Sequence, residues 1–180
     1  DTEAAVKAEE FVKASGSEQT PASASLEEPH RGNEQVGEWL AQSVAQMMNF
    51  APAGYDEHVR ALSAYADERG RTDFHGFIVN SNILDTMNKS NFQLRGSTEG
   101  AALLLNKGAV DGHYRWLFEV PMLVTFLPAD AKSYKDTEHL SQHLLVTAQV
   151  GRTAYGVNAD ELMVESFAAR KDPAYEEKQQ

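Results

Sequence analysis

Cysteine is absent from this 180-residue sequence, so the chain forms no disulfide bond and offers no thiol nucleophile. Long apolar runs are absent too, because no stretch of about 18 apolar residues exists that could cross a membrane as a helix. Basic residues number 16 against 27 acidic ones, giving a net charge of −11. A surface of that sign disfavours direct binding to nucleic acids and to anionic lipid headgroups.

Motifs that carry chemistry are missing as well. The glycines stand singly, mostly at turns, and form no Gly-x-Gly loop that could cradle a phosphate. No Gly-x-Ser-x-Gly nucleophile elbow occurs. Paired carboxylates such as Asp67-Glu68 fit solvated helix faces. The sequence therefore predicts no catalytic residue, no cofactor site and no metal site.

What is present divides the chain by composition. Thr2–Ala14 has the apolar spacing of a short helix, and Ser15–Arg31 is rich in Ser, Glu, Pro and Ala, as in a linker. Hydrophobic residues make up 42% of the sequence, enough for one core. We expect a flexible acidic N-terminal segment over residues 1–32, one domain over 33–169, and a polar, fraying tail over 170–180.

Helical periodicity fills the first half of the domain. Asn33 is a plausible N-cap for a helix whose apolar face runs to Met47 and which ends before Pro52. A second helix is predicted over Tyr55–Arg69, stopped by Gly70. A third helix should start at Thr72 or Asp73 and bury these apolar residues: Phe74, Phe77, Ile78, Leu84 and Met87.

From Phe92 onward the apolar period changes to two, which indicates strands. Trp116, on such a stripe, is expected in the core. Pro121 interrupts the longest strand, and since proline lacks a ladder N–H it implies a bulge or an edge position. Helices followed by antiparallel strands predict an α+β fold, with N-terminal helices packed on a curved antiparallel sheet. The predicted strands are Phe92–Gly96, Ala101–Asn106, Tyr114–Leu127, His139–Thr153 and Leu162–Ala168.

Two groups of side chains could in principle carry chemistry. His139 and His143 have the i, i+4 spacing of a helical zinc pair, with Glu138 beside them. The surrounding pattern is strand-like and offers no third ligand nearby in sequence, so we interpret them as ordinary surface or strand histidines.

The second group consists of His75, Asp73 and Tyr114, which could act as a general base and polar partners in a pocket. An Asp near a helix start beside a packed or solvated His is the simpler interpretation. The pocket requires these three side chains to converge on one cavity.

Short segments in a fixed order give the chain a family resemblance. Over about Gln35 to Ala168 it resembles the IcmL/DotI family, which includes the TraM proteins of type IVB conjugative plasmids. One departure is Gly70-Arg71, where the family has Gly followed by an aromatic residue. The matching segments are Trp39-Leu40, Asn49-Phe50, Tyr65, Gly70, Phe74, Ser81–Leu84, Leu103–Gly108, Gly112–Trp116, Leu144–Val146, Val150–Arg152 and Leu162–Phe167.

The resemblance implies an NTF2-like periplasmic domain of an inner-membrane core component of a type IVB secretion system. It implies no catalysis and no cofactor, but self-association into a homo-oligomer and contacts with other secretion components. The family's usual membrane span is missing, which suggests a periplasmic fragment, attached to the membrane only through a helix absent from this chain, or a soluble relative. From the resemblance we expect structural roles for the residues that match the family pattern: Gly112, Tyr114, Trp116 and Arg152.

The leading hypothesis is thus a structural and interaction component of a type IV secretion or conjugation apparatus, on the periplasmic side of the bacterial inner membrane. The alternative is an NTF2-like pocket enzyme or a small-ligand-binding protein on the same scaffold. A solute-transport or immunity-like binding protein is a third, weaker interpretation.

Overall fold

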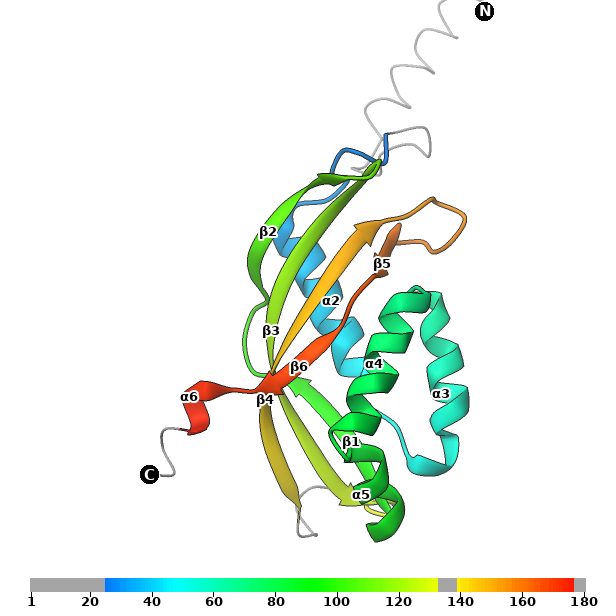
Figure 1. Cartoon of the computed structure of the whole chain (residues 1–180), viewed down its shortest axis with the longest axis vertical. Helices are drawn as coiled ribbons and strands as arrows, with labels where there is room; N and C mark the ends of the chain where they lie inside the picture. The colour runs from blue at the N-terminus through cyan, green and yellow to red at the C-terminus, as the bar shows by residue number, and fades with distance from the viewer. Residues whose placement is uncertain (1–24, 133–138, 177–180) are drawn as a thin grey trace, which may run out of the picture.

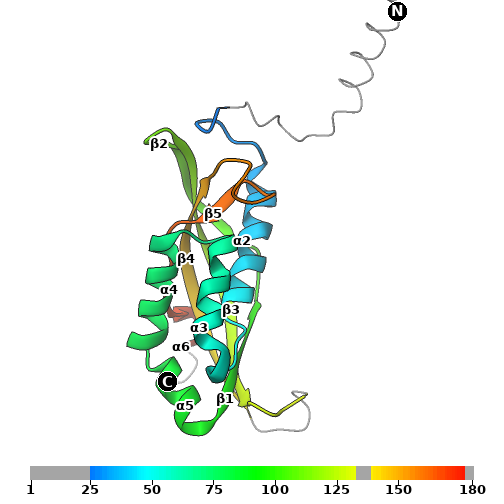
Figure 2. The ribbon, with the colours of Figure 1, turned by 90° about the vertical axis from the view of Figure 1, so that its right-hand side faces the viewer.

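A computed structural model describes residues 25–132 and 139–176 of the chain. One curved antiparallel sheet forms a layer, and helices cover one of its faces (Figures 1 and 2). The helical elements before the sheet are α2 Asn33–Met47, η1 Pro52–Gly54, α3 Tyr55–Ala61, η2 Leu62–Ala64, α4 Glu68–Asn80 and α5 Ile83–Ser90. The elements that follow are β1 Phe92–Thr98, β2 Leu103–Val110, β3 His113–Pro128, β4 Leu140–Arg152, β5 Leu162–Val164, β6 Ala168–Lys171 and α6 Pro173–Glu176. The α+β prediction is confirmed.

The two long strands β3 and β4 form the spine of the sheet. They pair antiparallel from Arg115 opposite Gly151 to Phe126 opposite Leu140. Each is flanked on its other side by two short strands. β1 pairs with the end of β3 and β2 with its beginning, while β6 pairs with the middle of β4 and β5 with its end. Short strands thus add to one long ladder from both sides.

Pro121 lies where the partner of β3 changes from β1 to β2. The β1 pairing ends at Met122 and the β2 pairing starts at Glu119. The carbonyl of Pro121 accepts a hydrogen bond from Glu99 N at 2.9 Å, in the connection between the two short strands. N and O of one strand residue point to the same side, so the missing N–H also faces this junction. The register with β4 runs through without a shift, so the proline occupies a local edge and not a bulge.

Alternation along the spine places one face of the sheet in the core. Helix α2 lies across this face and buries its own apolar stripe there, as does α4 with Phe74 and Ile78 (Figure 2). Full burial of each large apolar side chain contributes about 1.5–3 kcal/mol relative to exposure. The buried apolar side chains that alternate along this face are Trp116, Phe118, Val120, Met122, Val124 and Phe126 on β3 and Leu144, Val146, Ala148 and Val150 on β4.

The first helix is confirmed, with one correction at its start. Gly32, not Asn33, is the N-cap: its backbone is extended and its carbonyl accepts from Val36 N, while Asn33 is already helical. The helix ends before Pro52 as predicted.

The predicted second helix over Tyr55–Arg69 is wrong in extent. Helix α3 ends at Ala61, and the chain then extends at Tyr65–Asp67 to pair with Val164 of β5. Val164 N donates to Tyr65 O and Asp67 N donates to Val164 O. This tertiary pairing breaks the helix earlier than the local sequence indicates.

The predicted third helix starts too late and is too long. Asp67 caps α4 by accepting from Gly70 N at 2.8 Å, so Gly70 lies inside the first turn instead of stopping a helix. The helix ends at Asn80, and Asn82 adopts a left-handed backbone (φ 62°) before α5 begins at Ile83. Asn tolerates that conformation better than most residues. Thr72 and Asp73 are therefore interior helix residues.

The first four predicted strands are confirmed, with shifted ends, whereas the prediction over Leu162–Ala168 is wrong in part. The regular pairing is interrupted between β5 and β6. Glu165 N still donates to Gln149 O of β4, whereas Phe167 N donates to Asp73 Oδ2 of α4. The start of the predicted fraying tail is also wrong, because β6 pairs with β4 up to Lys171 and α6 follows.

The N-terminal boundary stays a prediction, since the expected helix over Thr2–Ala14 and most of the linker lie outside the described residues. Residues 25–31, however, which the composition assigns to the linker, are bonded to the domain. Tyr114 N donates to Leu26 O, and Arg152 reaches the carbonyl of Ser25.

Helix α4 offers a matched pair of glycine substitutions. A Cβ on Gly70 would overlap the carbonyl oxygen of Val164, whereas one on Gly76 meets only the Asn80 side chain, at 3.9 Å. We expect Gly70→Ala to destabilise the fold by about 2 kcal/mol or more, because backbone must move. Gly76→Ala should be neutral or stabilising by up to about 1 kcal/mol through helix propensity. Urea unfolding of both variants checks this. Equal midpoints would contradict the close packing of α4 on β5.

Candidate functional site

The side chains required by the pocket hypothesis do not converge. His75 Nδ1 lies 2.7 Å from Tyr55 Oη and its ring stacks on that tyrosine. Asp73 accepts from the backbone of Phe167, and the ring of Tyr114, on β3, packs edge-on against Trp116. The three are bound to different neighbours, and none lines either of the hollows described below. The geometry gives the pocket enzyme no support.

The histidine pair is not a helical pair. His143 lies within β4, as interpreted from the sequence, while His139 precedes that strand and Glu138 lies outside the described residues. Within residues 25–132 and 139–176 no group of three metal-ligating side chains occurs.

His143 instead belongs to a surface cluster that holds the C-terminal segment. Its Nδ1 lies 2.7 Å from Glu99 Oε1, and its ring stacks on Tyr175 with centroids 3.6 Å apart. Tyr175 Oη donates to the other oxygen of Glu99 at 3.3 Å, and the Glu99 carboxylate raises the pKa of this tyrosine. Asp172 N donates to the carbonyl of His143. The contacts fasten α6 to the sheet next to the junction opposite Pro121.

A first polar hollow of about 510 Å³ lies where the start of α4 meets β2, β3 and β4. Glu165 is its central group: Oε1 accepts from Arg115 Nε at 2.9 Å and from Gln149 Nε2 at 3.1 Å. Burial raises the pKa of Asp67 at the rim, opposed by its bond to Gly70 N. The lining carries both signs of charge and its central groups satisfy one another, which suits contacts with polypeptide more than proton transfer.

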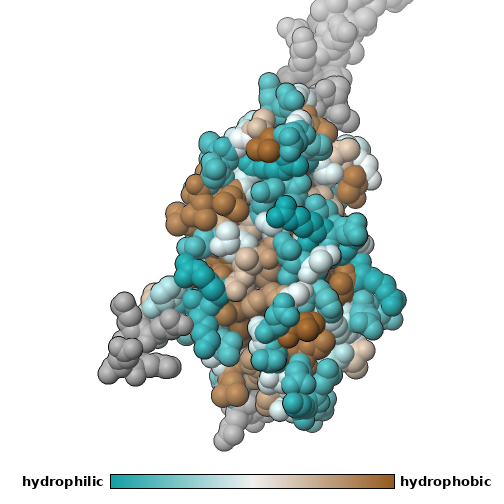
Figure 3. Space-filling view, viewed as in Figure 1, coloured by the Kyte–Doolittle hydropathy of each residue, from teal (hydrophilic) through white to brown (hydrophobic). Residues whose placement is uncertain are grey.

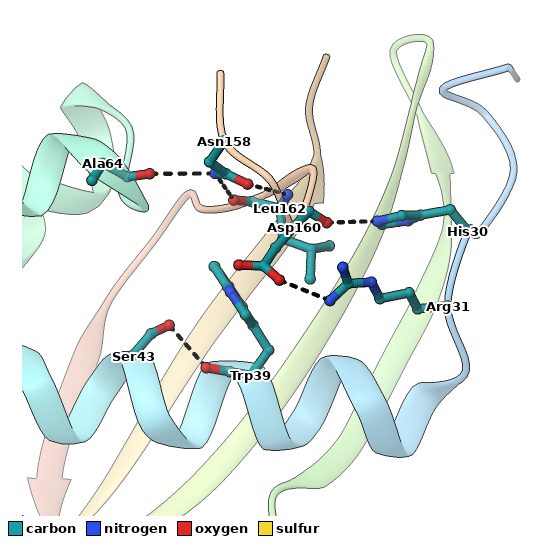
Figure 4. Close-up of polar contacts among 8 residues, drawn as sticks. All are labelled: His30, Arg31, Trp39, Ser43, Ala64, Asn158, Asp160 and Leu162. Carbon is teal, nitrogen blue, oxygen red and sulfur yellow. Dashed lines mark hydrogen bonds and ion pairs between the residues drawn. The ribbon is translucent and has the colours of Figure 1, made fainter. Parts of the chain in front are cut away.

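A further polar cluster, around Arg152 and Asp160, holds residues 25–31 against the end of the sheet (Figure 4). We call residues 25–31 the strap. Arg152 is its anchor: the residue is 3% exposed, and Nη1 donates to Ser25 O at 2.6 Å and to Glu28 O at 2.9 Å. Arg31 Nη1 lies 3.1 Å from Asp160 Oδ1, and His30 Nε2 lies 2.8 Å from the Asp160 carbonyl. Carbonyls only accept, so Nε2 carries the proton.

The loop that presents Asp160 is itself fixed. Asn158 Nδ2 donates to Leu162 O at 2.6 Å and reaches Ala64 O at 3.3 Å, while Leu162 N returns a bond to Asn158 Oδ1 (Figure 4). The strap, this loop and the start of α2 enclose a second hollow of about 1110 Å³, which Trp39 also lines.

Sequence reasoning missed most of these groups. Glu99 and Asp160 stand in segments with no periodic signal, and Glu165 lies in a predicted strand whose pattern says nothing of its partners. The partners of all three lie tens of residues away in sequence. Only Arg152 could be singled out from the sequence, because an arginine at the end of an apolar strand indicates a charged group held next to the core. Its burial fits the structural role expected of it, as does the left-handed backbone of Gly112 (φ 82°) in the turn before β3.

The fold and these clusters define an NTF2-like α+β protein whose polar side chains tie segments together. The sequence matches a protein family over residues 9–171. The chain belongs to this DotI/IcmL family, described as inner-membrane complex components of the type IVB secretion system. It is therefore a structural component of a type IV secretion or conjugation apparatus.

Solved structures show the same fold. The periplasmic domain of DotI is 21% identical with a TM-score of 0.68, over 79% of this chain and 97% of that one. A periplasmic fragment of TraM is 20% identical with a TM-score of 0.67, covering 78% and 98%. An IcmL-like type IV secretion system protein from Legionella pneumophila is 14% identical with a TM-score of 0.64, covering 79% and 94%.

No curated protein sequence matches the chain. Among the described residues, none of the helices combines the length and apolar character that a membrane span requires.

The Glu165 cluster gives a testable energetic contrast. Glu165→Gln weakens two hydrogen bonds to a largely buried carboxylate, one of them from a guanidinium, so we expect a loss of about 1–3 kcal/mol. Glu119 is the matched control, because it pairs at 3.8 Å with an Arg170 side chain that is 59% exposed. Glu119→Gln should change stability by less than about 0.5 kcal/mol. Chemical denaturation of both variants tests this, and equal losses would contradict the assigned role of Glu165.

Proposed function

We propose that this chain is a periplasmic scaffold that contributes to assembly of the inner-membrane core complex of a type IVB secretion or conjugation apparatus. In this proposal it self-associates, contacts other components of the apparatus, and lies on the periplasmic side of the inner membrane. It catalyses no reaction. The single observation that carries the proposal is the family match over residues 9–171.

The compared structures support the periplasmic location. Two of them are a periplasmic domain and a periplasmic fragment, and this chain covers 97% and 98% of those structures. The described part of the chain thus corresponds in extent to units that others identify as periplasmic.

The surface supports a role in protein contacts. Figure 3 shows a brown apolar patch at the place where Figure 1 labels β2. Leu103 and Leu105 of this strand are 60% and 47% exposed, and Val110 at its end is 53% exposed. Exposed apolar groups beside polar ones are typical of sites where proteins meet. Lys107 and the polar hollow around Glu165 adjoin the patch.

The proposal is tested by following assembly in a host that carries the matching secretion apparatus. The tagged chain should co-purify with other core components and sediment as an oligomer. The double variant Leu103→Ser/Leu105→Ser should lower the recovered partner or the oligomer at least about tenfold, since two apolar anchors are lost.

Val79→Ser is the control, because Val79 is 46% exposed but lies on α4, away from β2. It should leave assembly unchanged. A wild-type chain that stays monomeric and recovers no other component would overturn the proposed function. Equal loss in the control would overturn the assignment of the β2 surface.

A further inference from the structure

The strap is held by few contacts, all at one end of the sheet. Arg152 binds its carbonyls at Ser25 and Glu28, and Tyr114 N donates to Leu26 O at 2.6 Å. The side chains of its last two residues, His30 and Arg31, are hydrogen-bonded to Asp160. Any change that weakens one of these bonds therefore shifts the balance between a closed and an open strap.

His30 sits where an added proton has no acceptor. Because Nε2 donates to the carbonyl of Asp160, Nδ1 of the neutral ring carries a lone pair, and this atom is buried without a hydrogen-bond partner among the described residues. Two other buried nitrogens also have none there, Trp116 Nε1 and Arg152 Nε, and both are donors. A protonated Nδ1 would add a third unsatisfied donor.

These three nitrogens lie in one region. Trp116 pairs with Val150 across the spine, and Arg152 is two residues further along β4, so both side chains project from the same face. The ring centroids of His30 and Trp116 are 6.4 Å apart. The closed strap thus places His30 beside the buried side chains of Trp116 and Arg152.

Charges around the ring act in both directions. Burial is the main influence and lowers the pKa of His30, and the cations Arg152 and Arg31 act the same way. The bond to Asp160 and the carboxylate of Glu161 act against it. Two more carboxylates from α2 line the same hollow as the ring, Glu34 and Glu38.

We propose that the strap is a pH-sensitive connection: closed on the sheet while His30 is neutral, and released when a proton from water binds Nδ1. Opening exposes the ring to solvent and separates the protonated ring from Arg152. Residues 25–31 then leave the end of the sheet. The inference does not depend on the proposed function.

The sign of the effect follows from linkage. The closed strap holds the pKa of His30 below the 6.5 of a free ring, and the open strap restores it. Closure is therefore fully favoured above about pH 6.5 and is lost as pH falls through the lowered value. Between pH 7.5 and pH 5 the open-to-closed ratio can rise by at most about thirtyfold, the limit for a ring that titrates only when open.

The amide of Tyr114 reports directly on closure, because its hydrogen bond goes to the strap. Hydrogen exchange of the full chain should be measured at pH 7.5 and pH 5 and corrected for intrinsic rates. We expect its protection to fall by severalfold, up to about thirtyfold, at pH 5. Amides in the middle of β3 should keep theirs.

Variants separate His30 from its neighbours. His30→Gln keeps a donor for the Asp160 carbonyl but does not titrate, so Tyr114 should show equal protection at both pH values. His113→Asn is the matched control, since His113 lies at the same end and bonds the Arg152 carbonyl. It should retain the pH dependence. Asp160→Asn removes the ion pair with Arg31 but leaves His30 in place, so it should lower the protection of Tyr114 at both pH values and keep a further fall at pH 5.

Two results would overturn the proposal: unchanged Tyr114 protection in the wild-type chain between pH 7.5 and 5, or a full pH dependence in His30→Gln. If His30→Gln is already open at pH 7.5, NMR titration of the wild-type chain decides. The His30 ring and the Tyr114 amide should then share one midpoint below pH 6.5, and separate midpoints refute the coupling.

Discussion

The structure depends on one long hairpin, β3 with β4, whose inner face must be kept from water. Strand β3 is not stable in water by itself, because every second side chain between Trp116 and Val124 is a large apolar group. Pairing satisfies the backbone along one side of each strand, and the short strands β1, β2, β5 and β6 satisfy most of the rest. The helices then cover the inner face, so the fold is built outward from this ladder.

Close backbone contacts at β5 join the helical layer to the sheet. Val164 exchanges hydrogen bonds with Tyr65 and Asp67, and Gly70 packs against its carbonyl. One residue further, the Glu165 carboxylate accepts hydrogen bonds from the side chains of Arg115 and Gln149. A three-residue strand therefore orders the start of α4 and the polar hollow beside it. The polar clusters tie segments of the chain to one another.

Periodicity in the sequence was enough to predict the α+β class, the first helix and the order of the strands. The helix boundaries near Gly70 failed because glycine is a local stop signal, whereas its role here is close approach to Val164, a partner 94 residues away. The tail failed for a similar reason, since Lys171 gives no apolar pattern and is ordered by pairing with Leu144. The polar ties at Glu165 and Asp160 join residues far apart in sequence and leave no local signal. The family resemblance was recognised from short sequence segments in a fixed order and not from the residues of any site.

The junction at Pro121 has a mechanical consequence. Along most of its length β3 is bonded on both sides, but at this residue the neighbouring strand changes and the proline offers no N–H. A tensile load along β3 is therefore carried there mainly by its bonds to β4, loaded in shear, with Glu99 contributing one bond to the proline carbonyl. Glu99 also bonds His143 and Tyr175, so the C-terminal helix is attached to the sheet beside this junction.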